Sequence, residues 1–307
     1  MKITVITGQT ATGKTKLALE LATKYNGELI NCDSRQIYTS LNIITGKDIS
    51  PTSTFHSIHS IGNFELGYYK DSASPIWLYD IVHPDKSFSA YDFKTCCVWV
   101  IKDIIQRGKI PILVGGTYFY LQNLLYDTVA VDIPPNEPLR KELKNQSVTD
   151  LQSQLKQLDS LYFESLNNSE KYNPQRLIRK IEILKSRLSQ QSVQPDRLVS
   201  LSEQFKNVDF MGLRFGNKEK LEEAIRKRVD KRLREGAIGE TESILKDGHD
   251  EHDPGLRTIG YQQIIQYLKG AITKDKAIEE WITKEIQYAK RQYTFMKKDA
   301  NINWREV

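Results

Sequence analysis

Residues 8–15 read Gly-Gln-Thr-Ala-Thr-Gly-Lys-Thr, and this stretch decides the fold. It matches the pattern G-x-x-x-x-G-K-[ST], whose glycines let backbone N–H groups turn inward around phosphate oxygens. The β-branched run Lys2–Thr7 precedes the loop and predicts a strand, while Lys14–Lys24 follows it with apolar residues at helical spacing. A strand, this loop and an amphipathic helix in that order predict a phosphate-binding loop in an α/β fold.

Strand and helix signals continue to alternate through the first 130 residues. Glu28–Asn31, Pro75–Asp80 and Ile110–Val114 are short runs that predict strands. Ala90–Gln106 has helical periodicity and stops near Gly108. The alternation predicts a P-loop NTPase-like parallel sheet flanked by helices.

The pattern changes at the Pro-rich run Asp132–Pro138. From there to residue 206 the sequence is polar and helix-like, and residues 208–215 return to a strand-like pattern. We therefore expect two domains: an α/β core over residues 1–132 and 207–307, and an inserted all-helical domain over residues 133–206.

Two stretches of the core remain. Residues 218–298 predict C-terminal helices, punctuated by Gly236, Gly248 and Gly270. Residues 49–74 are rich in Ser, His and Gly, and we predict no element there.

The composition describes a globular chain of 307 residues, 39% hydrophobic and 27% charged, with a mean hydropathy of −0.50. No apolar run approaches the roughly 20 residues of a membrane helix. The three Cys and five His show no metal-binding spacing. We therefore expect a reduced, cytoplasmic protein without a membrane segment or a structural metal, and a monomer because nothing in the sequence requires a dimer.

The net charge of +5 is unevenly distributed along the chain. Residues 1–132 contain 12 basic and 12 acidic side chains, whereas residues 133–307 contain 32 and 27. A basic second part is typical of a protein that binds an anionic macromolecule.

Candidate catalytic side chains follow the predicted strands, at the edge where open α/β sheets bind ligands. Lys14 would place its charge on terminal phosphates, and the Thr15 hydroxyl would ligate Mg²⁺. Asp33 follows the second strand, where its carboxylate either accepts a proton from a bound acceptor or caps a helix. The run Gly115-Gly116-Thr117 either lets a ligand approach the backbone closely or forms a tight turn.

Three later segments interleave cations with apolar or aromatic residues. Residues 174–180 place two Arg and one Lys within one helical turn. In residues 225–233 the apolar positions should face inward and the cations outward. Residues 288–298 mix Lys and Arg with Tyr and Phe. Each segment is either an RNA-binding surface or a solvated helix face with packed aromatic rings.

Blocks along nearly the whole chain, in order, resemble the bacterial-type tRNA dimethylallyltransferases, also called isopentenyl-diphosphate:tRNA transferases. The N-terminal blocks are GQTATGKT (8–15), DSRQIY (33–38), PIWLYDIVHPDKSFSAYDF (75–93) and IPILVGGTYFYLQNLL (110–125). The later blocks are NPQRLIRKIEIL (173–184), GLRTIGYQQIIQYLKG (255–270) and YAKRQYTFMKKD (288–299).

The resemblance implies transfer of a dimethylallyl group from dimethylallyl diphosphate to the exocyclic amine of the adenosine immediately 3′ of the anticodon, with Mg²⁺ as cofactor. It implies Asp33 as the general base, Thr117 as a contact of the reacting groups, and Lys14 and Arg228 as cations on the diphosphate. The residues implied to hold the diphosphate are Gly8, Gln9, Thr10, Ala11, Thr12, Gly13, Lys14 and Thr15. Those implied to contact the tRNA anticodon stem-loop are Asp33, Ser34, Arg35, Gln36, Thr117, Arg140, Pro174, Gln175, Arg176, Leu177, Ile178, Gly255, Leu256, Arg257, Thr258, Ile259, Gly260, Lys290, Arg291, Gln292, Tyr293, Thr294, Phe295, Met296 and Lys297.

Gln9 stands where the family has Pro, which we expect to alter the stiffness of the loop but not its N–H groups. Two other classes of protein stay open. A small-molecule P-loop kinase would use the same loop for ATP, with Asp80 as its Mg²⁺ ligand and Arg176 and Arg179 in a lid. A non-catalytic RNA-binding NTPase would bind tRNA without any need for Asp33.

Overall fold

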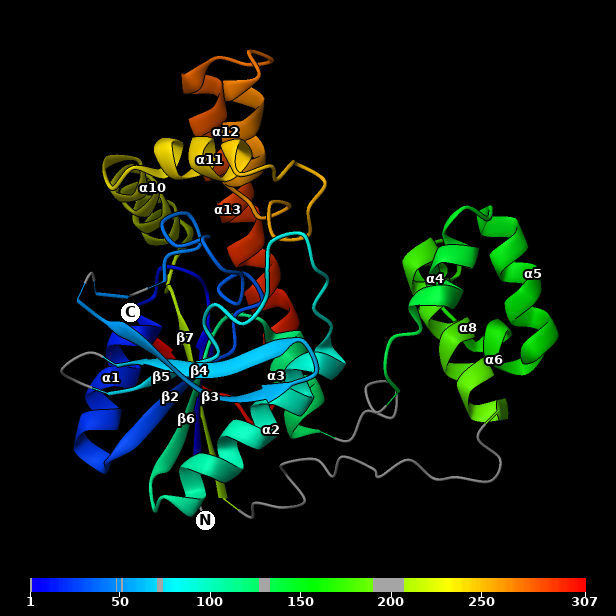
Figure 1. The fold of residues 1–307 in the computed structure, drawn as a ribbon, viewed down its shortest axis with the longest axis horizontal. Helices are drawn as coiled ribbons and strands as arrows, with labels where there is room; N and C mark the ends of the chain where they lie inside the picture. The colour runs from blue at the N-terminus through cyan, green and yellow to red at the C-terminus, as the bar shows by residue number, and fades with distance from the viewer. Residues whose placement is uncertain (1, 48, 51, 71–73, 127–132, 190–206) are drawn as a thin grey trace. The chain divides into compact units, whose positions relative to one another are not determined.

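A computed structural model of the chain describes all residues except 1, 48, 51, 71–73, 127–132 and 190–206 (Figure 1). The chain divides into two compact units. The larger unit comprises residues 1–88, 93–126 and 200–307, and the smaller unit comprises residues 89–92 and 127–199.

The larger unit is built on an eight-stranded sheet with the order β3-β4-β5-β2-β6-β1-β7-β8. Every neighbouring pair from β5 to β8 is parallel, whereas β3–β4 and β4–β5 are antiparallel. The predicted parallel sheet is therefore confirmed. The strand bounds are β1 (Lys2–Gly8), β2 (Gly27–Asn31), β3 (Thr54–Ile61), β4 (Phe64–Lys70), β5 (Ile76–Trp77), β6 (Ile110–Val114), β7 (Asn207–Arg214) and β8 (Asn303–Glu306).

The helices of the larger unit confirm the predicted helical segments. Figure 1 shows α10, α11 and α12 gathered beyond one end of the sheet, with the long α13 running from them toward α3. The bounds are α1 (Lys14–Tyr25), α2 (Ala90–Gln106), α3 (Tyr118–Leu125), α10 (Lys218–Arg234), α11 (Ala237–Lys246), α12 (Tyr261–Leu268) and α13 (Lys274–Met296). None of the helices in the described ranges combines the length and apolar character that a bilayer crossing requires.

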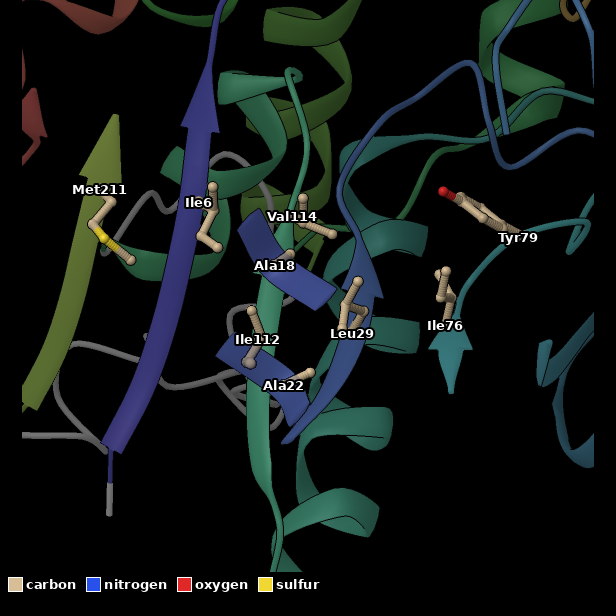
Figure 2. Packing of buried hydrophobic residues seen from close by; sticks show 9 residues of the cluster. All are labelled: Ile6, Ala18, Ala22, Leu29, Ile76, Tyr79, Ile112, Val114 and Met211. Atoms are coloured by element: carbon tan, nitrogen blue, oxygen red, sulfur yellow. The ribbon is translucent and has the colours of Figure 1, made fainter. Parts of the chain in front are cut away.

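The centre of the sheet packs against α1 through small and branched side chains. Figure 2 shows Ala18 and Ala22 of α1 beside Ile6, Leu29 and Ile112 on three adjacent strands. All five side chains are at most 1% exposed. Alanine lets the helix approach the strands closely, and burial of the branched side chains stabilises the contact. This packing fixes the start of α1, and with it the phosphate-binding loop.

The hairpin β3–β4 lies within residues 49–74, where we predicted no element. Nearly all residues of β3 are exposed or half-buried, so no alternation of polar and apolar residues marks it in the sequence. The predicted strand Pro75–Asp80 is wrong in length, because only Ile76–Trp77 form β5. Leu78 and Asp80 have φ angles of +64° and +55°, which end the strand.

The smaller unit contains only helices among its described residues. Its core consists of Leu143, Leu151, Leu155, Phe163, Leu166, Leu177 and Ile181. Beside this core the buried carboxylate of Glu182 accepts hydrogen bonds from Arg140, Arg179 and the N–H of Asn136. The bounds are α4 (Glu137–Lys144), α5 (Val148–Leu158), α6 (Ser160–Ser165), α7 (Asn168–Lys171) and α8 (Pro174–Ser189).

Candidate active site

The phosphate-binding loop runs from the end of β1 into α1. Gly8 has a φ of +132°, and a Cβ there would lie 2.0 Å from the backbone oxygen of Leu213 on β7, so only glycine fits. Gly13 has a φ of +79° and immediately precedes α1. The first N–H groups of a helix have no partner within it and carry the positive end of its dipole. The loop therefore presents hydrogen-bond donors to an anion.

Lys14 is the cation of this loop. Its Nζ donates to the carbonyl oxygen of Gln9 at 2.6 Å. Burial and the nearby charge of Arg228 lower the pKa of Lys14 from 10.5 to about 8, although the Asp33 carboxylate acts in the opposite direction. Two partly buried cations are thus held close together, where an anion would stabilise both.

Two glutamines fix the loop to its surroundings. The Oε1 of Gln292 on α13 accepts from the N–H of Thr10 at 3.0 Å, and its Nε2 donates to the carbonyl of Gly116 at 3.0 Å. The Oε1 of Gln9 accepts from the N–H of Phe215 at 2.9 Å, just after β7. Gln9, which replaces the family's Pro, therefore attaches the loop to the neighbouring strand. Sequence reasoning did not find this role for either residue.

The turn after β6 requires two glycines. A Cβ on Gly115 would lie 2.3 Å from the carbonyl carbon and oxygen of Cys32, and a Cβ on Gly116 would lie 2.2 Å from the Nε2 of Gln292. The backbone after β6 therefore passes directly against the end of β2 and against α13. Protein atoms fill the space that a side chain would need at either glycine, as the tight-turn interpretation requires, and Gly115 also lines the cavity described below.

Asp33 and Thr117 are brought together where β2 and β6 end. The N–H of Ser34 donates to Thr117 Oγ1 at 2.9 Å, and Thr117 Oγ1 donates to Ser34 Oγ at 3.2 Å. One oxygen of Asp33 accepts from the N–H of Arg35 at 2.9 Å. That oxygen caps a turn rather than a helix. The carboxylate also lines the cavity between the loop and α10.

A cavity of about 840 Å³ joins the loop, Asp33 and α10. Its lining is strongly cationic, because Lys and Arg from the loop, from α10 and from residue 47 outnumber the acids Asp33 and Glu235. An anionic ligand with several charges suits such a cavity. The lining residues are Thr10, Ala11, Gly13, Lys14, Thr15, Lys16, Asp33, Gln36, Asn42, Ile43, Gly46, Lys47, Ile49, Tyr79, Val114, Gly115, Ala224, Lys227, Arg228, Lys231, Arg232 and Glu235.

Helix α10 supplies Arg228 and Arg232, which are one turn apart. Ile225 and Val229 face inward as predicted. The expectation that every cation on this helix faces outward is wrong for Arg232, which is only 4% exposed. Its guanidinium has an acid, Glu285 on α13, as counter-charge, with NH1 3.6 Å from Oε1. Because Glu285 offers a negative charge and the cavity offers space, the Arg232 side chain can point inward.

Asp80 lies behind the cavity wall. Its Oδ1 pairs with the ammonium of Lys47, which also donates to the carbonyl of Tyr38 at 2.6 Å. Its Oδ2 accepts from the hydroxyl of Tyr69 at 2.7 Å. Both carboxylate oxygens are therefore engaged by protein donors, and Asp80 is absent from the cavity lining.

The residues implied to contact tRNA differ in accessibility. In the larger unit, exposed side chains are those of Arg257, Lys290, Arg291, Thr294, Phe295 and Lys297. Buried there are Gly255, Leu256, Thr258, Gly260, Gln292 and Met296, and partly exposed are Ser34, Arg35, Gln36, Thr117, Ile259 and Tyr293. In the smaller unit Pro174, Gln175 and Arg176 are exposed, Ile178 and Arg140 are partly exposed and Leu177 is buried.

The cavity offers oxygen ligands of the kind that a magnesium ion bound to phosphate groups would take. Thr15 contributes a hydroxyl and Asp33 a carboxylate to the same lining. Within the described ranges, no group of three or more His, Cys, Asp or Glu could hold a metal by itself. Mg²⁺ commonly takes one or two protein oxygens and completes its shell with phosphate oxygens and water, so this sparse set of ligands fits it.

Comparisons with known proteins agree on one family. A family model described as IPP transferase matches residues 36–299. A tRNA dimethylallyltransferase from Anoxybacillus flavithermus is 34% identical over 99% of this chain and 89% of its own length. The crystal structure of the tRNA isopentenylpyrophosphate transferase from Bacillus halodurans is 30% identical, with a TM-score of 0.67 over 99% of this chain and 89% of that chain. A eukaryotic dimethylallyltransferase acting on tRNA, 24% identical with a TM-score of 0.73, covers 99% and 73% respectively and shows the same fold.

Proposed function

Because the chain belongs to the IPP transferase family of tRNA dimethylallyltransferases, we propose that it transfers a dimethylallyl group from dimethylallyl diphosphate to tRNA within the cavity described above. The acceptor is the exocyclic amine of the adenosine immediately 3′ of the anticodon. One observation carries the placement of the reaction: a single cavity is lined by the phosphate-binding loop, by Arg228 and by the Asp33 carboxylate. The same cavity can therefore hold a diphosphate next to a base.

The donor half of the reaction uses the cations. The bond between the allylic carbon and the diphosphate oxygen breaks, and its electron pair leaves with the diphosphate. Lys14, Arg228 and the N–H groups of the loop lie where this negative charge grows, so they stabilise the transition state more than the ground state. When bound, Mg²⁺ would be held by Thr15 and would supply further positive charge to the leaving oxygens.

The acceptor half uses Asp33 and its neighbours. The amine of adenine is a weak nucleophile because its lone pair is delocalised into the ring. As the new N–C bond forms, the free oxygen of Asp33 takes the proton that the nitrogen must lose. Thr117, fixed by Ser34, lies beside this carboxylate and is placed to contact the reacting groups. The base must leave its stack to reach the cavity, so we propose that the tRNA is bound with this adenosine extruded.

The remaining implied residues would grip the tRNA. The exposed cations on the C-terminal part of α13 and Arg257 suit backbone phosphates, and Phe295 offers a ring for stacking. We propose that residues 133–206 form the insertion that binds the anticodon stem-loop, through exposed residues such as Arg176. We propose that the protein acts as a monomer, because nothing in its sequence requires a dimer. We propose that it acts in the cytoplasm, where tRNA is found.

The substitution Asp33→Asn tests this function. With labelled dimethylallyl diphosphate and tRNA, we expect it to lower the rate of transfer by about 100-fold or more, because general base catalysis contributes at least that much. Affinity for tRNA and for inorganic pyrophosphate should remain, since Lys14 and Arg228 are untouched. Asp230→Asn, an exposed aspartate on α10, is the matched control and should transfer at the wild-type rate.

Unchanged turnover of Asp33→Asn would remove its role as base. A wild-type protein that leaves tRNA unmodified but phosphorylates a small acceptor from ATP would instead support the kinase alternative. Against that alternative stands Asp80, whose two oxygens are engaged by Lys47 and Tyr69.

A further inference from the structure

Arg232 is a buried cation whose hydrogen-bonding capacity is only partly used. The residue is 4% exposed, yet it lines the cavity. Its NH2 atom is buried and donates to no acceptor among the described residues. Its NH1 lies 3.6 Å from Glu285 Oε1, beyond good hydrogen-bond distance. A buried guanidinium normally has acceptors for its N–H groups, so we expect a bound ligand to supply the missing acceptors of Arg232.

Arg232 and Arg228 converge on the same part of the cavity. A Cβ built on Gly46 would lie 2.4 Å from Arg232 NH2 and 3.0 Å from Arg228 NH2. Arg228 NH2 makes only a long bond of 3.4 Å to the carbonyl of Thr45, and its Nε is buried without a partner among the described residues. Two guanidinium groups thus direct unused N–H donors toward the space over Gly46, on the cavity side of α10.

Around this space three cations, Arg228, Arg232 and Lys14, outnumber the two acids Glu285 and Asp33. Glu285 is the buried acid beside Arg232, and burial raises its pKa, although the charge of Arg228 acts in the opposite direction. Lys14 adds a third cation, close enough to Arg228 for its pKa to be lowered. Several cations with free donors around one space match the many acceptor oxygens of a phosphate chain.

We propose that Arg232 is a second guanidinium ligand of the diphosphate, placed by Glu285 and acting beside Arg228. This inference rests on the proposed function for the identity of the donor molecule. Arg228 and Arg232 would contact the diphosphate from α10, while the loop N–H groups and Lys14 contact it from α1. Arg232 would then help to hold the donor before reaction and to stabilise the diphosphate as it leaves.

Paired substitutions separate this role from that of a structural ion pair. Arg232→Gln alone leaves Glu285 buried without a counter-charge and could fail to fold. The double variant Arg232→Gln/Glu285→Gln removes both charges and keeps the net charge of the cavity unchanged. Arg226→Gln, an exposed arginine on the same helix, is the control. Each protein is titrated calorimetrically with inorganic pyrophosphate, and its stability is followed by urea unfolding.

We expect the double variant to unfold near the wild-type urea concentration but to bind pyrophosphate about tenfold or more weakly, because charged hydrogen bonds are lost. Its KM for dimethylallyl diphosphate should rise while its affinity for tRNA stays unchanged. Wild-type affinity for pyrophosphate in the double variant would overturn the inference, as would a wild-type protein that does not bind pyrophosphate. Weakened pyrophosphate binding together with a wild-type protein that leaves tRNA unmodified would uphold the role of Arg232 and reject the proposed function.

Discussion

Replacing Lys14 by Met should make the larger unit more stable while removing a cation that the proposed reaction needs. Burial and the charge of Arg228 lower the pKa of Lys14 from 10.5 to about 8, so the folded state disfavours the protonated ammonium. Methionine has a similar length and no charge, and it can take the same partly buried position without this penalty. Stability and ligand binding therefore oppose each other at this residue.

The size of the effect follows from the pKa. Each pKa unit corresponds to about 1.4 kcal/mol, so a fall from 10.5 to about 8 sets an upper limit of about 3.5 kcal/mol on the penalty at neutral pH. Methionine also loses the hydrogen bond to the Gln9 carbonyl, worth about 1 kcal/mol. That carbonyl keeps a second donor, the hydroxyl of Thr12 at 2.7 Å. We expect a net gain of about 2 kcal/mol in the free energy of unfolding.

The pH dependence has a definite sign. Below pH 8 both the folded and the unfolded state carry protonated Lys14, so the full penalty applies to the wild type. Between pH 8 and 10.5 the folded state releases the proton while the unfolded state keeps it, so wild-type stability rises with pH. The advantage of Lys14→Met should therefore shrink over this range.

Urea unfolding followed by tryptophan fluorescence measures the stability of the larger unit, which contains Lys14. All four tryptophans belong to the larger unit: Trp77, Trp99, Trp281 and Trp304. Lys16→Met, an exposed lysine in the same first helical turn, is the control and should change stability by less than about 1 kcal/mol. A Lys14→Met protein that is no more stable than wild type at pH 7, or whose advantage is the same at pH 10, would refute the reasoning.

Two further substitutions test the framework around the site. Burial raises the pKa of Glu28, but hydrogen bonds from Arg107, Lys109 and Trp77 outweigh it and lower the pKa to about 2. Glu28→Gln should therefore lower the free energy of unfolding by about 3 kcal/mol at pH 7. This contribution is present above pH 4.5 and disappears as the pH falls toward 2. If the urea midpoints of variant and wild type were as far apart near pH 2 as at pH 7, the reasoning would be contradicted. Gly115→Ala should destabilise the larger unit by several kcal/mol and lower transfer activity, since its Cβ would lie 2.3 Å from the Cys32 backbone. Thermal melts compare this variant with Gly239→Ala on α11, whose added Cβ would have no atom within 4 Å and which should be neutral or stabilising. Equal melting temperatures for the two variants would show that the turn after β6 tolerates a side chain.

The sequence predicts the fold best where hydrophobic periodicity and loop chemistry agree. The first strand, the phosphate-binding loop and α1 are confirmed because a buried strand and a packed helix leave a clear pattern of apolar residues. The hairpin β3–β4 was missed because its first strand is exposed, and its pairing partners rather than its own side chains define it. The C-terminal strand β8 was missed for the same reason, since it is four residues long and mostly exposed.

The sequence motifs predicted the main residues of the site, but not the residues that hold them in place. Lys14 was found from the loop motif, Asp33 from its place after a predicted strand and Arg228 through the resemblance, and all three line one cavity. Gln292 joins two turns that are distant in sequence, and no local spacing marks such a contact. Arg232 stands among several cations in one helix, and only its four-residue spacing from Arg228 hints at a shared face.

The position of β1 in the sheet has a consequence for synthesis on the ribosome. β1 lies between β6 and β7, yet β7 comes from residues 207–214, which follow all residues of the smaller unit. A nascent chain that has emerged as far as residue 130 can pair β1 with β6, but the other edge of β1 has no strand to pair with. That open edge carries Gly8, whose fit against Leu213 belongs to the finished protein only. The phosphate-binding loop is thus among the first parts synthesised and among the last to reach its final form, and until then its strand edge is open to pairing with other chains.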